Sequence, residues 1–229
     1  MLKHLKFVPN LLTSANLLSG CLAIVYSFEG RLDIALYLVL LAAAFDFLDG
    51  FAARVLDAIS PIGKELDSLS DLISFGLAPA VMLYVVSIDV WSQGIAPVVK
   101  YLPFLLVVFS ALRLAKFNVD TRQDSDFLGL PTPANALFFI SFANLIQNYS
   151  LFQNETIIAT TILFFSIMMV SELKIFSLKK ISKDKVKLTF VILLTLVTIA
   201  SIAFYGLYAG VIIIPVYLLF SGIKTFIIK

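Results

Sequence analysis

Long apolar segments follow one another along almost the whole chain, separated by short polar stretches. A membrane-spanning helix needs roughly 20 mostly apolar residues. The pattern therefore predicts an all-α integral membrane protein with about eight transmembrane helices. A short basic and apolar segment over residues 1–10 further predicts an N-terminal helix lying on the membrane surface. The predicted spans cover about 11–28, 32–55, 67–88, 95–117, 132–149, 156–175, 186–205 and 208–226.

The composition supports this prediction. The chain has 229 residues, of which 60% are hydrophobic and 14% charged, and its mean hydropathy is +1.00. Soluble domains are nearer half apolar and a quarter charged. We expect one membrane domain over residues 1–229, without a soluble domain. The basic loop at 177–187 is interpreted as an anchor beside anionic lipid head groups, not as a nucleic-acid site.

The positions of Lys and Arg predict the orientation. They gather at the N-terminus, in the even-numbered loops and at the C-terminus, and Arg31 and Lys100 are the exceptions. By the positive-inside rule, both termini face the cytoplasm in a multi-pass protein of the cell membrane. This arrangement needs an even number of spans, so six is the alternative to eight.

The chain contains one cysteine, Cys21, and one histidine, His4. These counts exclude an intrachain disulfide, a zinc site built on Cys and His, and a Ser–His or Cys–His catalytic pair. A metal in this protein must therefore be held by oxygen ligands, which favours Mg²⁺, Mn²⁺ or Ca²⁺.

Four acids interrupt the apolar pattern between residues 46 and 71. Asp46 and Asp49 are three residues apart, so they share one face of a predicted helix. Pro61 breaks that helix. Asp67 and Asp71 follow four residues apart, again on one face. Two facing helices would thus present four carboxylates to one pocket near the cytoplasmic surface, which is therefore the predicted active site.

Buried charges in a membrane are costly, and four acids near one arginine repel each other. Two divalent cations bridged by carboxylates would relieve the repulsion and could clamp a pyrophosphate. Gly50 and Gly63 would leave room for that pyrophosphate, and Arg54 would pair with a phosphate oxygen. The alternative is a cation or proton path through a transporter.

The spacing of these residues resembles the signature of the CDP-alcohol phosphotransferases. Asp46, Asp49, Gly50, Ala53, Arg54, Gly63, Asp67 and Asp71 occupy every position of that signature. The resemblance implies membrane helices around a cytoplasm-facing polar cavity, two Mg²⁺ or Mn²⁺ ions, and a homodimer. It implies metal ligation by the four acids, with Asp71 also the general base. It covers residues 8–136, and 137–229 are predicted to add further transmembrane helices.

A second segment, residues 9–16, resembles the part of these enzymes that holds the cytidine nucleotide. Asn10 and Thr13 supply polar groups for a base or ribose, and Ser60 is a further candidate for a phosphate or ribose contact. The alternative is that Thr13 or Ser14 caps a helix by accepting from free backbone amides.

Two further segments, 111–118 and 127–136, resemble the phosphatidylserine synthase branch of the family. The second contains Gly129-Leu130-Pro131, which predicts a rigid, non-helical entry to the fifth span. Arg113 and Lys116 are candidates for binding the carboxylate of serine. The alternative for both is anchoring at the cytoplasmic interface.

Together these resemblances imply a transferase that moves a phosphatidyl or archaetidyl group from CDP-diacylglycerol or CDP-archaeol to L-serine and releases CMP. The same chemistry with inositol phosphate or glycerol 3-phosphate as acceptor is the first alternative. A cation-coupled transporter is the second.

Overall fold

A computed structural model of the protein describes residues 6–91, 99–120, 127–175 and 185–227. In these ranges nearly all residues are helical, and a helix occupies each of the eight predicted segments. The helices are α1 (Val8–Phe28), α2 (Leu32–Val55), α3 (Pro61–Asp71), α4 (Ala78–Trp91), α5 (Leu105–Val119), α6 (Thr132–Asn148), α7 (Glu155–Val170), α8 (Lys185–Tyr205) and α9 (Gly210–Ile227).

Short irregular helices extend or connect these elements. A π-helical segment, η2 (Leu72–Leu77), joins α3 to α4 in one continuous rod, and a 3₁₀ segment, η3 (Val99–Phe104), leads into α5. Two more 3₁₀ turns, η4 (Ser150–Phe152) and η5 (Gly206–Tyr208), follow α6 and α8. The π-helical segment begins directly after Asp71, and such irregular turns are often found at functional sites.

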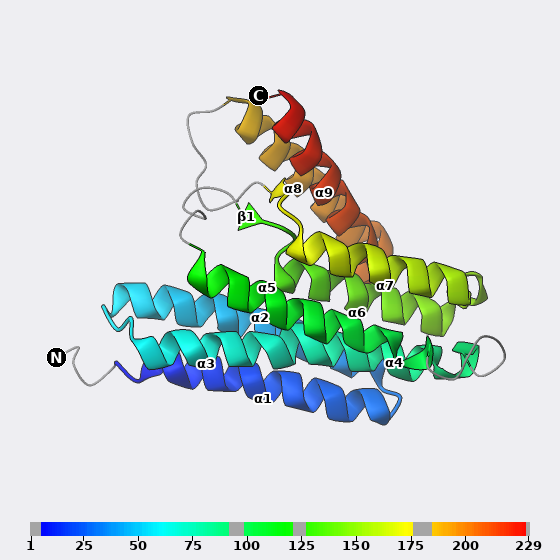
Figure 1. The fold of residues 1–229 in the computed structure, drawn as a ribbon, viewed down its shortest axis with the longest axis horizontal. Coiled ribbons are helices and arrows are strands. Elements are labelled where there is room, and N and C mark those ends of the chain that lie inside the picture. Colours follow the sequence, from blue (N-terminus) through cyan, green and yellow to red (C-terminus); the bar gives the residue numbers. More distant parts are fainter. Residues whose placement is uncertain (1–5, 92–98, 121–126, 176–184, 228–229) are drawn as a thin grey trace.

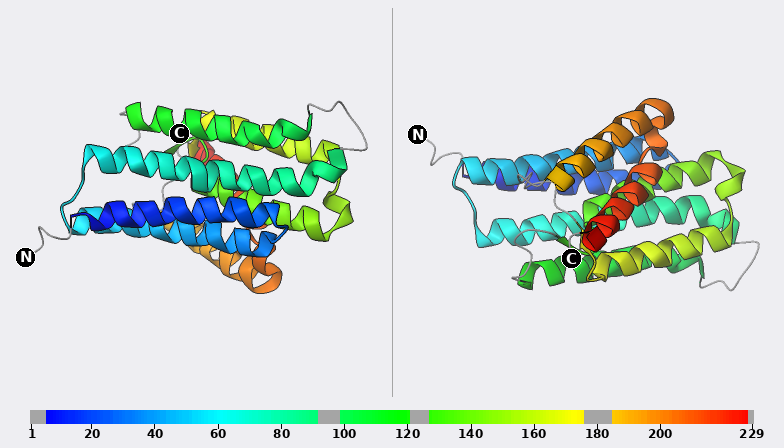
Figure 2. Two further views of the ribbon diagram at one scale, coloured as in Figure 1. Left: turned by 90° about the horizontal axis from the view of Figure 1, so that it is seen from below. Right: turned by 90° about the horizontal axis from the view of Figure 1, so that it is seen from above.

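The helices α1 to α7 run roughly along the long axis of the molecule, whereas α8 and α9 cross them obliquely on one side (Figure 1). Figure 2 shows the same inclination from two further directions. α6 connects the two parts, because it packs against α4 and α2 and also against α9.

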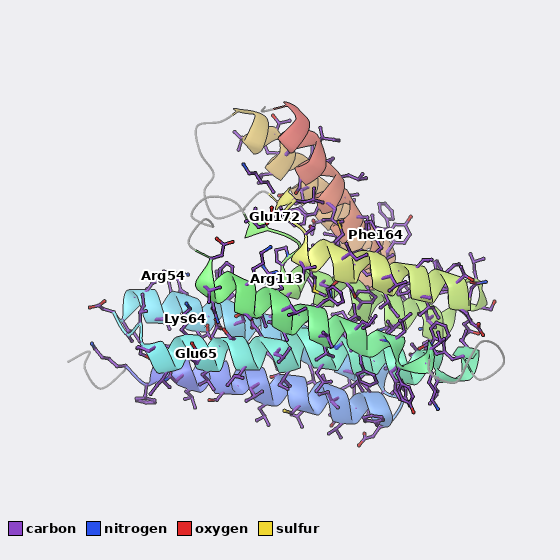
Figure 3. All side chains as sticks on the ribbon, in the orientation of Figure 1. Arg54, Lys64, Glu65, Arg113, Phe164 and Glu172 are labelled. Carbon is purple, nitrogen blue, oxygen red and sulfur yellow. The ribbon has the colours of Figure 1, made fainter. Side chains whose placement is uncertain are left out.

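Five helical segments are long and apolar enough to cross a membrane: Val8–Phe28, Leu32–Val55, Pro61–Ile88, Val99–Val119 and Leu188–Tyr208. Large apolar side chains, among them Phe164 on α7, lie on the outer surface (Figure 3). These observations confirm a multi-pass membrane protein. Because α7 and α9 are apolar but shorter, the number of eight spans stays a prediction.

The N-terminal boundary differs from the one expected. α1 already begins at Val8, so residues 8–10 belong to this helix and not to a separate interfacial one. The preceding residues 1–5 lie outside the described ranges. α1 starts early because Pro9 suits the first turn of a helix, where its missing N–H costs no hydrogen bond.

Small residues on α1 let it pack closely against the rod formed by α3 and η2. A side chain at Gly20 would collide with Ser74, including its backbone. Ser70 Oγ donates to the Thr13 carbonyl at 3.1 Å, and Ser74 Oγ donates to the Asn16 carbonyl at 3.0 Å. Close packing and interhelical hydrogen bonds are the main attractions between helices in lipid. They hold the second pair of acids against α1.

The predicted break between the two acid-bearing helices is confirmed. α2 ends at Val55, and α3 begins at Pro61 with Ser60 as its N-cap. Ser60 Oγ accepts a hydrogen bond from the Gly63 N–H at 3.1 Å, which satisfies one of the free amides at the start of the helix. Because the chain reverses here, α3 packs against α1 and brings Asp67 back to the acids of α2.

The Gly-Leu-Pro segment forms the rigid entry to α6 that the sequence predicts. Gly129 has a positive φ of 74°, and its N–H donates to the Leu173 carbonyl at 3.0 Å. The preceding strand β1 (Phe127–Leu128) pairs antiparallel with β2 (Lys174–Ile175). Pro131 then caps α6, so that Thr132 is its first residue.

Replacing Gly129 by alanine should destabilise the protein. The left-handed backbone alone costs a non-glycine residue about 1–2 kcal/mol, and the added methyl would collide with the Met169 carbonyl. We expect a lower thermal unfolding temperature in detergent. Gly222→Ala in α9 is the control, because in the described part of the chain no atom outside the neighbouring backbone of α9 lies within 4 Å of the added methyl. Equal unfolding temperatures for the two variants would contradict this account of the turn.

Candidate active site

Three acids form a close group at the end of the molecule where α2 ends and α3 begins. Asp46 and Asp49 come from α2 and Asp67 from α3, and one carboxylate oxygen from each lies within 4.8 Å of the others. Asp49 is buried and the other two are half-buried. The grouping follows the shared helix faces that the spacing predicts. Carboxylate oxygens so close together repel each other when ionised, and they fit a hard divalent cation such as Mg²⁺ or Mn²⁺.

Asp71 lies beside this group, one turn further along α3. Its side chain is 9% exposed, and Oδ1 has no hydrogen-bond partner in the described ranges. It is near enough to Asp46, Asp67 and Asp49 for the negative charges of all three to repel its ionised form. The four predicted acids therefore come together, with three in the closest cluster and Asp71 as its buried neighbour.

The Thr13 hydroxyl holds one of the acids in place. Thr13 Oγ1 lies 2.5 Å from Asp49 Oδ2 and 3.0 Å from the Pro9 carbonyl oxygen. Hydrogen bonds to an ionised carboxylate are shorter and stronger than neutral ones, so the hydroxyl proton is shared mainly with Asp49. Ser14 Oγ instead donates to the Asn10 carbonyl at 2.8 Å. The capping alternative is therefore wrong for both residues, because both hydroxyls donate to oxygen.

A pocket of about 210 Å³ opens beside the three acids. It contains every residue that the sequence predicts for CDP-lipid binding except Arg54. The lining residues are Pro9, Asn10, Thr13, Asp49, Gly50, Ala53, Ala58, Ile59, Ser60, Gly63, Lys64 and Asp67.

The two glycines keep this pocket open in different ways. A methyl group at Gly63 would lie 3.1 Å from both Asn10 Oδ1 and Ser60 Oγ, so glycine leaves room for both polar side chains. A methyl at Gly50 would lie 3.8 Å from Arg54 Nη1. The exposed Arg54 side chain thus extends over Gly50 at the margin of the pocket, and its label in Figure 3 marks this end of α2.

Arg113 on α5 brings a buried positive charge to Asp71. Its side chain is 8% exposed, Nη1 donates to Thr132 Oγ1 at 2.8 Å, and Nε has no partner within the described residues. It lies near enough to Asp71 for the two opposite charges to attract each other. Figure 3 places Arg113 further along the bundle than Arg54 and Lys64. The structure therefore brings this predicted acceptor residue to the acid cluster.

Lys116, the other predicted acceptor residue, pairs with an acid outside the cluster. Its Nζ lies 3.8 Å from Glu172 Oε1, and both side chains are well exposed. This position favours the alternative interpretation, a charge at the membrane interface. Lys64 donates from Nζ to the Asn118 carbonyl at 3.1 Å, so it ties α3 to the end of α5.

Two asparagines near this site were missed by the sequence analysis. Asn16 on α1 and Asn135 on α6 are both completely buried. They lie in the two segments 9–16 and 127–136 that resemble the family. An asparagine within an apolar helix carries no signal of its own in one sequence, because its role depends on which helix it faces.

Comparison with known proteins agrees with this geometry. The sequence profile of the CDP-alcohol phosphatidyltransferases matches residues 6–170. An archaetidylserine synthase of Methanothermobacter thermautotrophicus is 41% identical over 141 residues, which are 59% of this chain and 57% of that protein.

Two bacterial relatives are each called CDP-diacylglycerol–serine O-phosphatidyltransferase. The protein of Helicobacter pylori is 31% identical over 210 residues, or 87% of this chain and 86% of that one. The protein of Bacillus subtilis is 30% identical over 176 residues, or 77% of this chain and 93% of that one. Since the family profile spans most of the chain and includes all four clustered acids, this protein belongs to the CDP-alcohol phosphatidyltransferase family.

Proposed function

We propose that this protein transfers a phosphatidyl or archaetidyl group from a CDP-lipid to L-serine and releases CMP. The observation that carries the proposal is the buried Arg113 beside Asp71, which puts a carboxylate-binding cation next to the acid site of this family. The names of the three relatives support serine as the acceptor. They also include both lipid classes, so the donor is CDP-diacylglycerol or CDP-archaeol.

The pocket beside the acids supplies the donor site. Asn10, Thr13 and Ser60 provide polar groups for the cytidine nucleotide, and all three line the pocket. Gly50 and Gly63 leave space for the pyrophosphate, which Arg54 would contact from the pocket margin.

The acids supply the metal ligands. Asp46, Asp49 and Asp67 would hold divalent cations, Mg²⁺ or Mn²⁺, with Asp71 adjacent, and two ions would offset most of the negative charge of four carboxylates and a pyrophosphate. Ions bound there would neutralise the pyrophosphate charge and stabilise the departing CMP oxygen.

Asp71 then acts as the general base. It accepts the proton of the serine hydroxyl, and the serine oxygen forms a bond to the phosphorus on the lipid side. The bond from that phosphorus to the CMP oxygen breaks, and CMP leaves with the electron pair. Arg113 binds the serine carboxylate and balances the charge of Asp71. Orientation of the two substrates and charge neutralisation provide most of the acceleration.

A phosphorylated acceptor fits the site less well. A phosphate group is bound best by several clustered cations. Lys116 pairs with Glu172 and Lys64 donates to a backbone carbonyl, which leaves Arg113 as the buried cation beside the acids in the described ranges. A carboxylate needs one such partner. A transporter would not need the pocket beside the acids and is not supported by the family.

The remaining predictions concern the surroundings of the site. The distribution of Lys and Arg favours a cytoplasmic active site and cytoplasmic termini in the cell membrane. The family resemblance implies a homodimer.

The direct test is CMP release by the purified protein in detergent with CDP-diacylglycerol or CDP-archaeol and Mg²⁺ or Mn²⁺. Parallel reactions receive serine, inositol phosphate, glycerol 3-phosphate or no acceptor. We expect release that depends on serine. Release with a phosphorylated acceptor alone would contradict the assignment of serine, and absence of release from folded protein with every acceptor would contradict the transferase.

The Thr13–Asp49 hydrogen bond gives a second prediction. Thr13→Val retains the shape of the side chain but removes the donor to Asp49. Groups that orient metal ligands typically contribute 10- to 100-fold to metal affinity. We therefore expect half-maximal CMP release to need roughly 10–100 times more Mg²⁺, and direct Mn²⁺ titration followed by electron paramagnetic resonance to show the same loss.

Ser14→Ala is the matched control, since this neighbouring hydroxyl is exposed and bonds within its own helix. Its metal dependence should equal that of the wild type. An unchanged metal dependence in Thr13→Val would show that Thr13 does not orient a metal ligand.

A further inference from the structure

Two buried asparagines outside the donor pocket have unused hydrogen-bonding groups. Asn16 on α1 and Asn135 on α6 are 0% exposed, and in each of them neither Oδ1 nor Nδ2 bonds to any group in the described ranges. A buried polar group without a partner is costly, and each such group in a native structure calls for an explanation.

The burial of an asparagine in α6 does not by itself leave its amide unbonded. Asn144, on the same helix and 3% exposed, donates from Nδ2 to the Ile140 carbonyl at 3.0 Å. Asn135 is nine residues earlier, about two and a half turns away, and makes no such bond. Its free amide therefore points to a partner that is neither the helix backbone nor a described side chain.

Asn16 is a neighbour of the proposed base. Its side chain lies within interaction range of Asp71, although no hydrogen bond of good geometry joins them. The Asn16 carbonyl accepts from Ser74, three residues after Asp71. This bond fixes α1 against the segment that follows the acid.

Asn135 is connected to the same residues through α6. It follows Thr132 by three residues on α6, so the two share a helix face. Thr132 accepts the hydrogen bond from Arg113, and Arg113 attracts Asp71. A chain of neighbouring residues therefore connects the two asparagines, in the order Asn16, Asp71, Arg113, Thr132 and Asn135.

The unbonded groups along this path complement an amino acid. Arg113 Nε and the Asn Nδ2 atoms are donors, which suit a carboxylate, whereas the Asn Oδ1 atoms are acceptors, which suit an ammonium group. Asp71 Oδ1 is an acceptor for a hydroxyl proton. A phosphorylated acceptor offers no ammonium group to use the amide oxygens.

We propose that Asn16 and Asn135 are specificity-determining residues that bind the acceptor amino acid between Asp71 and Arg113. Asn135 and Arg113 bind the carboxylate. Asn16 accepts from the ammonium group and so directs the hydroxyl to Asp71. The proposal rests on serine transfer as the function of the site.

The test replaces each asparagine in the full-length purified protein. Asn16→Leu and Asn135→Leu keep the size of the side chain but remove both polar groups. Because one hydrogen bond to a charged group is lost, the KM for serine should rise roughly 10- to 100-fold. The KM for the CDP-lipid should stay within about twofold, since neither residue lines the donor pocket.

Thermal unfolding separates a binding role from a structural one. Removal of an unbonded amide from the interior should leave the unfolding temperature unchanged or higher. Asn144→Leu is the control, since this asparagine is buried in α6 but already bonded, and its serine KM should match the wild type. If the leucine variants do not fold, Asn16→Ala and Asn135→Ala replace them in the same KM and unfolding measurements.

The two KM values and the unfolding temperature together decide whether the asparagines bind the acceptor. A serine KM that rises while the lipid KM and the unfolding temperature hold supports the assignment. An unchanged serine KM in either variant overturns the role of that asparagine, and so does a rise in both KM values with a lower unfolding temperature. A wild-type protein without serine-dependent CMP release overturns the proposed function and this inference together.

Discussion

The mutual repulsion of four carboxylates inside a largely apolar protein is the constraint on which the rest of the structure depends. Asp46, Asp49 and Asp67 lie within a few ångströms of one another, and Asp71 is buried beside them. Such a group is stable when positive charge is brought to it. Arg113 supplies some of this charge from α5, and divalent cations fit the three outer acids. The same need for positive charge makes the site suitable for chemistry on a pyrophosphate, which requires those cations too.

Much of the remaining fold serves to hold these acids in position. Thr13 bonds to Asp49, while Ser70 and Ser74 bond to α1 and fix the rod that carries Asp67 and Asp71. The turn at residues 129–131, held by backbone hydrogen bonds to the end of α7, fixes the start of α6. Thr132 at that start receives the Arg113 hydrogen bond. The positive and negative partners are thus oriented by separate segments that meet at Asp71.

The acid cluster was predictable because helical spacing places Asp46 with Asp49 and Asp67 with Asp71 on single faces. The break at Pro61 and the turn at Gly129 were also readable, since proline and glycine restrict or permit particular backbone angles. Tertiary contacts could not be predicted from the sequence. The Thr13 hydroxyl donates a hydrogen bond to Asp49 on another helix, and Lys116 forms an ion pair with Glu172, which is far from it in the sequence. Asn16 and Asn135 gain meaning only once helix packing brings them near the acids, and the count of spans depends on a membrane boundary that helix length alone does not settle.

We propose that Asp71 is the base that links the acid cluster to the acceptor, and its replacement by asparagine tests this role. CMP release and CDP-lipid binding are measured for Asp71→Asn, with Asp57→Asn as the control in the exposed loop between α2 and α3. Loss of a general base typically slows turnover by about 10²- to 10⁴-fold. The account predicts such a loss with CDP-lipid affinity largely retained, and nearly wild-type behaviour for the control. Full activity of Asp71→Asn would contradict it.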